Sequence, residues 1–166
     1  MAIEGERTHA DYDSREEARQ HVMLVALYID MICADLVRRA TVHDASKWRP
    51  EEYLFRDKHL PELRASEYGS AEYDAILKKM KPAIDHHHQL NSHHPEHFRN
   101  GVAGMNIIDL VEMFADWCAV MHKKGEKINT HRGAQRYKFD PQLVNIFQNT
   151  EEMAEIIRAK NGAYEP

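Results

Sequence analysis

The sequence is poor in the residues on which several classes of protein depend. Its 166 residues include two cysteines, seven glycines and six prolines. Cys33 and Cys118 lie far apart, each inside an apolar run, so they form neither a CxxC motif nor a disulfide framework. We interpret both as reduced core residues of a cytoplasmic protein.

Neither a targeting signal nor an excess of positive charge is visible. The N-terminus is polar and acidic, which does not fit a secretory signal. The longest apolar stretch, Val22–Val37, contains Asp30 and Asp35, and we predict that it is too short to span a bilayer. The net charge of −5 argues against a long nucleic acid and leaves open a small anionic, nucleotide-like substrate. We expect no membrane partner, and a homo-oligomer stays open.

The sequence also lacks the alternation of polar and apolar residues that is typical of strands. We therefore predict an all-α fold, an irregular helical bundle in which residues 1–166 form a single domain. The first helix is apolar nearly all round, so we expect it to be central. Pro61 and Gly69 indicate breaks, and Pro82 indicates a kink or a split. The predicted helices cover residues 15–39, a stretch from Pro50, 70–89, 107–123, a short stretch from Pro141, and 150–160, with an exposed loop over 126–139.

Histidine is the residue type in excess. The chain has 12 histidines, and five of them fall between His86 and His94. Acidic residues also interrupt apolar helices. Asp116 lies in the most apolar part of its helix, where an unpaired carboxylate would cost several kcal/mol. Asp109, Glu112 and Asp116 share one helix face, which is repulsive unless a positive group lies against it.

A divalent metal ion would resolve both problems. His21, His43, Asp44 and Asp116 offer two imidazoles and two carboxylates from three elements. His87 and His94 could complete a second metal position, with Asp44 as the bridge. Imidazole and carboxylate suit Mn, Fe, Co and Zn, so one or two such ions are the predicted cofactor. Two ions about 3.5–4 Å apart can activate a water and hold a phosphoryl group.

Other interpretations of these residues stay open. Asp44 could cap a helix beside a surface His43, and His21 could be an ordinary core histidine. Asp116 could form an internal salt bridge with Lys47. Of the neighbours His93 and His94, we expect only one to point inward, and we favour His94.

The ordered set of histidines and aspartates, from about Arg15 to Met121, resembles the HD-domain superfamily of metal-dependent phosphohydrolases. More narrowly, the chain is similar to a small family of phage and bacterial proteins. The motifs that carry the resemblance are His43-Asp-Ala-Ser-Lys47, Pro50-Glu-Glu, His86-His-His-Gln-Leu-Asn-Ser-His-His-Pro95 and Glu112-Met-Phe-Ala-Asp-Trp117.

The resemblance implies a metal-binding core over about residues 15–122, with a helical extension over about 140–160. It selects His87 from the run of three histidines. It also implies a cytoplasmic enzyme of a bacterial or phage-infected cell, which hydrolyses a nucleotide or another small phosphate ester with a metal-activated water. Two alternatives are a di-iron oxygenase of the HD type and a non-catalytic, metal-stabilised binding module of phage origin.

One position departs from the nucleotidase members of that superfamily. Those enzymes often place a glutamate three residues after the His-Asp pair, whereas this chain has Lys47. Because an ammonium group is a poor general base, we expect Lys47 to hold a phosphate oxygen. We predict Lys47 and Glu112 as the catalytic residues, with Glu51 and Glu52 as alternatives for the base.

Overall fold

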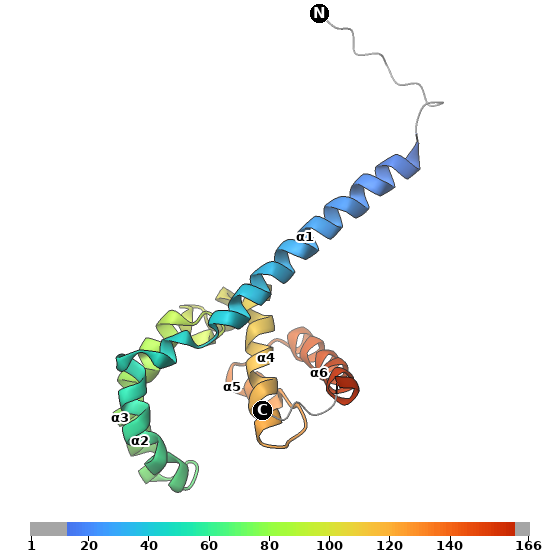
Figure 1. The fold of residues 1–166 in the computed structure, drawn as a ribbon. Coiled ribbons are helices and arrows are strands. Elements are labelled where there is room, and N and C mark those ends of the chain that lie inside the picture. Colours follow the sequence, from blue (N-terminus) through green and yellow to red (C-terminus); the bar gives the residue numbers. More distant parts are fainter. Residues whose placement is uncertain (1–12, 162–166) are drawn as a thin grey trace, which may run out of the picture. The chain divides into compact units, whose positions relative to one another are not determined.

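The computed structural model describes residues 13–161, and this part of the chain folds into helices without a strand (Figure 1). The predicted all-α class is confirmed. The chain divides into two compact units between Thr41 and Val42. The elements are α1 (Ser14–Val42), η2 (Ala45–Trp48), α2 (Pro50–Ala65), α3 (Ala71–Leu90), η3 (Pro95–His97), η4 (Gly101–Gly104), α4 (Ile107–Lys123), α5 (His131–Arg136) and α6 (Pro141–Asn161).

Helix α1 dominates the first unit. None of its side chains is buried in the described structure, whereas the sequence predicted a central helix. The helical stretch from Ser14 to Trp48 contains an 18-residue window of mean hydropathy 1.5. By length and composition alone it can cross a membrane, although the core helix of a soluble protein passes the same test. Val22–Val37 is the shorter apolar part of this stretch, and the expectation that it does not span a bilayer stays a prediction.

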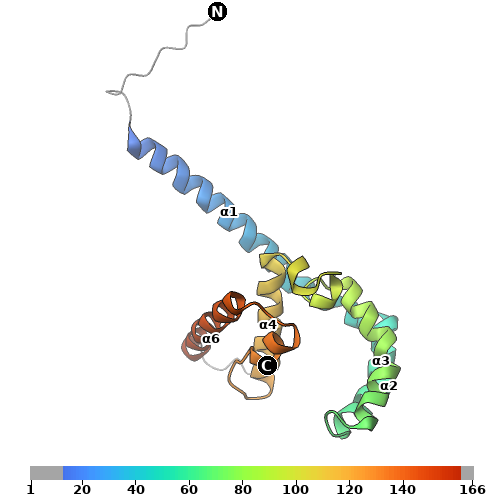
Figure 2. The ribbon, with the colours of Figure 1, turned by 180° about the vertical axis from the view of Figure 1, so that it is seen from behind.

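Helices α2 and α3 lie side by side in the second unit, as Figure 1 and Figure 2 both show. Ile76, Met80 and Ala83 of α3 are buried. Neither internal proline ends its helix, so the predicted break at Pro61 and split at Pro82 are wrong. Both prolines are exposed, which lets water bond the carbonyl groups that each ring leaves unpaired.

The cap at the start of α4 fixes the helix that carries two of the predicted site residues. The Asn106 side chain accepts a hydrogen bond from the Asp109 backbone, and Asp109 accepts one from the Asn106 backbone at 3.0 Å. Asp109 also accepts a hydrogen bond of 2.7 Å from the Ser92 hydroxyl. Asp109 is 1% exposed. This buried carboxylate therefore ties the loop after α3 to the helix that presents Glu112 and Asp116.

The C-terminal part differs from the sequence prediction in two places. The expected loop over residues 126–139 contains α5, and α6 is one helix where two were predicted. Thr150, the expected start of the last helix, donates its hydroxyl to the Ile146 carbonyl oxygen at 2.7 Å, so its side chain does not cap a new helix. Aromatic rings of α4 and α6 pack together, with the centroids of Phe114 and Phe147 5.6 Å apart.

Candidate metal centre

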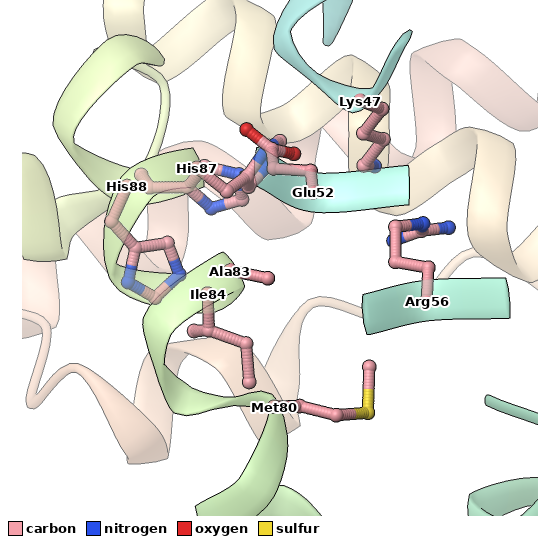
Figure 3. Close-up of a pocket in the computed structure, with 9 residues that line it drawn as sticks. Lys47, Glu52, Arg56, Met80, Ala83, Ile84, His87 and His88 are labelled. Carbon is pink, nitrogen blue, oxygen red and sulfur yellow. The ribbon is translucent and has the colours of Figure 1, made fainter. Parts of the chain in front are cut away.

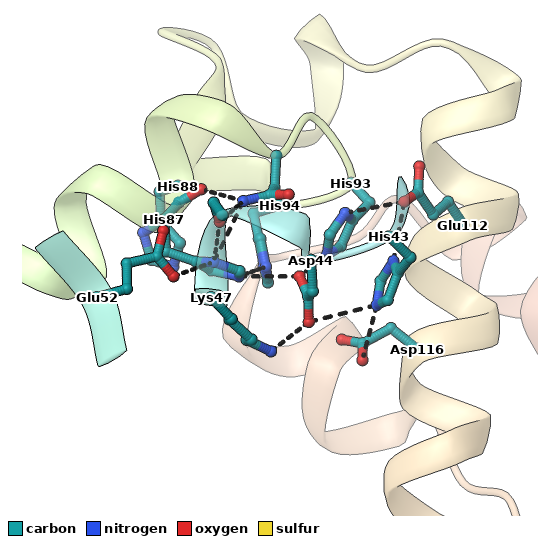
Figure 4. Close-up of polar contacts among 12 residues, drawn as sticks. His43, Asp44, Lys47, Glu52, His87, His88, His93, His94, Glu112 and Asp116 are labelled. Carbon is teal, nitrogen blue, oxygen red and sulfur yellow. Dashed lines mark hydrogen bonds and ion pairs between the residues drawn. The ribbon is translucent and has the colours of Figure 1, made fainter. Parts of the chain in front are cut away.

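The residue on which the site is centred has an unusual backbone conformation. Asp44 follows the end of α1 with a φ of 56°, in the left-handed region that aspartate tolerates better than bulky residues. Its carbonyl oxygen accepts the Lys47 N–H at 2.8 Å, which begins the 3-10 turn η2. Residues held in this region often occur at functional sites. Figure 4 shows the carboxylate of Asp44 with His87 and His94 on one side and His93 and His43 on the other.

Each oxygen of Asp44 meets different partners. Asp44 Oδ1 lies 3.2 Å from His87 Nε2 and 3.5 Å from His93 Nε2. Asp44 Oδ2 lies 3.4 Å from His43 Nε2 and pairs with the Lys47 ammonium group. Burial works to raise the pKa of Asp44, but the contacts with His87 and Lys47 hold it far below its usual range. Asp44 is therefore a carboxylate that can serve two positions at once.

Two glutamates lie behind the histidines and orient them. His87 Nδ1 is 3.0 Å from Glu52 Oε2, and His43 Nδ1 is 2.9 Å from Glu112 Oε1. His93 Nδ1 is 3.3 Å from the same Glu112 oxygen. An ionised carboxylate only accepts hydrogen bonds, so each Nδ1 carries a proton, and Nε2 is the ring nitrogen that can turn a lone pair toward a cation. This is the arrangement in which a carboxylate prepares histidine to bind a metal through Nε2.

Ring nitrogens and a carboxylate oxygen lie close together in the buried part of the site. Asp44 Oδ1 and His93 Nε2 are buried and have no hydrogen-bond partner among the described residues. His87 Nε2 is close to Asp44 Oδ1 but does not make a well-directed hydrogen bond to it. His87 Nε2 and His94 Nε2 are 2.9 Å apart, so either a proton on one of them or a cation joins the two nitrogens. The donor set therefore fits a divalent cation.

Among the described residues, four groups of potential ligands occur, and two of them share Asp44. Asp44, His87, His93 and His94 each offer an atom within 4.8 Å of the others. His43, Asp44 and Asp116 do the same. These clusters could hold a metal ion, as the predicted cofactor requires. Asp44 belongs to both groups.

The two groups differ in charge. The carboxylate of Asp116, 3.7 Å from His43 Nε2, is the main cause that raises the pKa of His43 to about 9, against the effect of burial. Burial, with the neighbouring His93 and His87, lowers the pKa of His94 to about 3. The imidazole of His94 is therefore neutral. The imidazole of His43 carries a second ring proton, and so a positive charge, when no cation competes for it.

The comparison with protein families gives a match over most of the chain. Residues 10–153 match the profile of a family of unknown function, DUF5662. The chain belongs to the DUF5662 family. All the residues from His43 to Asp116 that form the site lie within the matched stretch. The family description carries no activity, so the resemblance to the HD-domain superfamily stays a prediction. No curated protein and no solved structure matches the chain significantly.

In this DUF5662 protein most of the predicted ligands converge. The structure brings together His43, Asp44, His87, His94 and Asp116. His21 is an exposed residue of α1 in the first unit, and its role as a ligand stays a prediction.

The two predicted catalytic residues lie in different places. Lys47 pairs with Asp44 at the edge of the site. Glu112 lies behind the imidazoles of His43 and His93, at their Nδ1 atoms. This position suits a residue that orients histidines, and its catalytic role stays a prediction.

Sequence reasoning missed His93, which is 1% exposed and belongs to the first ligand group. The prediction that only one of His93 and His94 points inward assumed the side-chain directions of neighbours in a helix. Both residues lie in the turn between α3 and η3, where that rule does not apply. The turn residues Asn91 and Ser92 beside them were the available signal.

Proposed function

We propose that this DUF5662 protein is a metal-dependent phosphohydrolase that acts on a nucleotide or another small phosphate ester. The observation that carries the proposal is the direction of three imidazoles. His43, His87 and His93 turn Nε2 toward Asp44 while buried or half-buried carboxylates hold Nδ1. Such orientation favours metal ligation over a merely structural histidine cluster.

The ligand groups support one or two ions. Asp44, His87, His93 and His94 would hold one ion. His43, Asp44 and Asp116 would hold a second. Nitrogen and oxygen ligands of this kind suit Mn, Fe, Co or Zn. Divalent ions supply Lewis acidity, which lowers the pKa of water and neutralises charge on a phosphoryl group.

The protein's own groups account for phosphate binding beside these ligands. Lys47 lines a cavity of about 210 Å³ together with His87 and His94. Its ammonium group neutralises Asp44 and lies within reach of an anion in that cavity. Lys47 would hold a non-bridging phosphate oxygen, as a point charge does. Glu112 would keep His43 and His93 in the tautomer that binds metal.

Metal content and turnover test the proposal together. Protein purified without chelators should carry at least one Mn, Fe, Co or Zn ion per chain, as measured by elemental analysis. With Mn or Co added, it should hydrolyse nucleotides or bis(p-nitrophenyl) phosphate.

Three variants sharpen the test. Asp44→Asn should remove the metal, while Asp85→Asn, on an exposed residue of α3 that pairs with Lys81, should keep it. Lys47→Met should keep the metal and lose turnover. Substoichiometric metal in the wild-type protein, or equal metal in both Asp variants, would contradict the proposal.

A further inference from the structure

Two basic residues connect the cavity beside the histidines to a second cavity. Lys47 and Arg56 line the first cavity, of about 210 Å³, and also a second one of about 440 Å³. Figure 3 shows both basic side chains on one side of the first cavity, opposite His88. Small-molecule sites usually measure roughly 300–1,000 Å³, and the two cavities together fall within this range. A ligand longer than a single phosphate therefore fits.

Arg56 is available for an anion. It is half-buried on α2, and it makes no ion pair or hydrogen bond among the described residues. Glu52, one turn earlier on the same helix, is engaged with His86 and His87. A guanidinium group in a cavity without a carboxylate partner is suited to bind phosphate through two parallel hydrogen bonds.

The second cavity adds aromatic rings to these charges. Trp48 and Tyr53 line it, and they are 83% and 39% exposed. A tryptophan this exposed, next to a basic residue at a cavity, is unusual for a ring that only packs. Tryptophan and tyrosine stack on flat rings such as nucleobases. Asp57 lines the same cavity, and its carboxylate disfavours a second phosphate there while it can accept hydrogen bonds from a base.

We propose that Trp48, Tyr53 and Arg56 form a specificity subsite, in which Trp48 stacks on the base of a nucleoside monophosphate. Arg56 and Lys47 hold the phosphate between the base and the histidine cluster. This inference rests on the proposed function for its reacting phosphate, and it goes further by naming a ring-bearing substrate. The acidic Asp57 and the net charge of −5 favour one nucleotide over a polynucleotide.

Binding without metal tests the subsite separately from the chemistry. The four ribonucleoside 5′-monophosphates and ribose 5-phosphate, which lacks a base, are titrated into the protein in EDTA by calorimetry. At least one nucleotide should bind about fivefold or more tightly than ribose 5-phosphate, since stacking on an aromatic side chain is this strong. Trp48→Ala should abolish the preference, and Trp48→Phe should retain most of it.

A matched pair of charge variants tests the phosphate contact. Arg56→Met should weaken both the nucleotide and ribose 5-phosphate by about tenfold or more. Arg64→Met removes the same charge from an exposed position of the same helix and should leave both affinities unchanged. Thermal melting of each variant shows whether the fold is kept.

The outcomes separate the two proposals. Metal content and turnover of the same preparations judge the phosphohydrolase, and the nucleotide preference in EDTA judges the subsite. Three results would overturn the subsite. These are no detectable nucleotide binding at millimolar concentration, equal binding of ribose 5-phosphate, and a preference that survives Trp48→Ala in a protein that melts like the wild type.

Discussion

Replacement of Glu52 by glutamine tests whether this buried carboxylate orients His87 for metal binding or only supports the fold. Glu52 is 1% exposed, and its two oxygens lie 2.9 Å from His86 Nδ1 and 3.0 Å from His87 Nδ1. Burial works to raise the pKa of Glu52, but hydrogen bonds from Ser46 and His86 outweigh it, so the group stays ionised. Glutamine keeps the shape but offers one oxygen, and its NH₂ group must face the other Nδ1–H.

The size of the effect follows from these contacts. A hydrogen bond to a charged group contributes about 1.5–3 kcal/mol. With one bond lost and one weakened, Glu52→Gln should lower the free energy of unfolding by about 2–4 kcal/mol. The melting temperature should then fall by about 5–15 °C for a chain of this size. Because His87 loses the acceptor that fixes its tautomer, metal affinity should fall by about 10- to 100-fold.

Two measurements on one matched pair of proteins check this reasoning. Thermal melts in EDTA report stability, and competition with a chelating dye reports metal affinity. Glu62→Gln is the control, since Glu62 belongs to the same helix, its side chain is 58% exposed, and it lies 3.6 Å from His59 Nδ1. Wild-type metal affinity in Glu52→Gln, with a lowered melting temperature, would show that Glu52 only supports the fold. No change in either quantity would refute the argument.

Three further outcomes are expected. Burial, with help from two nearby glutamates, raises the pKa of Cys118 to about 11, whereas Cys33 is exposed, so at pH 8 iodoacetamide should modify Cys33 first. The rate at Cys118 should rise with pH up to about 11, and equal rates at pH 8 by mass spectrometry would contradict this. A Cβ at Gly133 would lie 2.2 Å from the Trp117 ring, so Gly133→Ala should reduce the unfolding free energy by about 1–2 kcal/mol despite its better helix propensity; an unchanged thermal melt would be the opposite result. His93→Ala should lower the metal content measured by elemental analysis, and full retention would remove His93 from the ligand set.

The sequence by itself determined what depends on neighbours along the chain. The all-α class follows from apolar spacing, and α4 begins and ends where its cap and its apolar run predict. The capping box of Asn106 and Asp109 joins residues three positions apart, so no distant part of the chain is needed to form it. The same local reasoning was wrong at Pro61 and Thr150, because exposure to water and a bond to the preceding turn let the helices continue.

Only the tertiary structure decided how the site residues act. Glu112 meets His43 across 69 positions of sequence, and Glu52 meets His87 across 35. Spacing along one helix showed that Glu112 and Asp116 share a face, but it could not show which imidazole nitrogen each would meet. That choice depends on how η2, α2, α3 and α4 converge around Asp44. Long-range packing therefore sets which nitrogen of each histidine keeps its lone pair, and with it the capacity of the site to bind a cation.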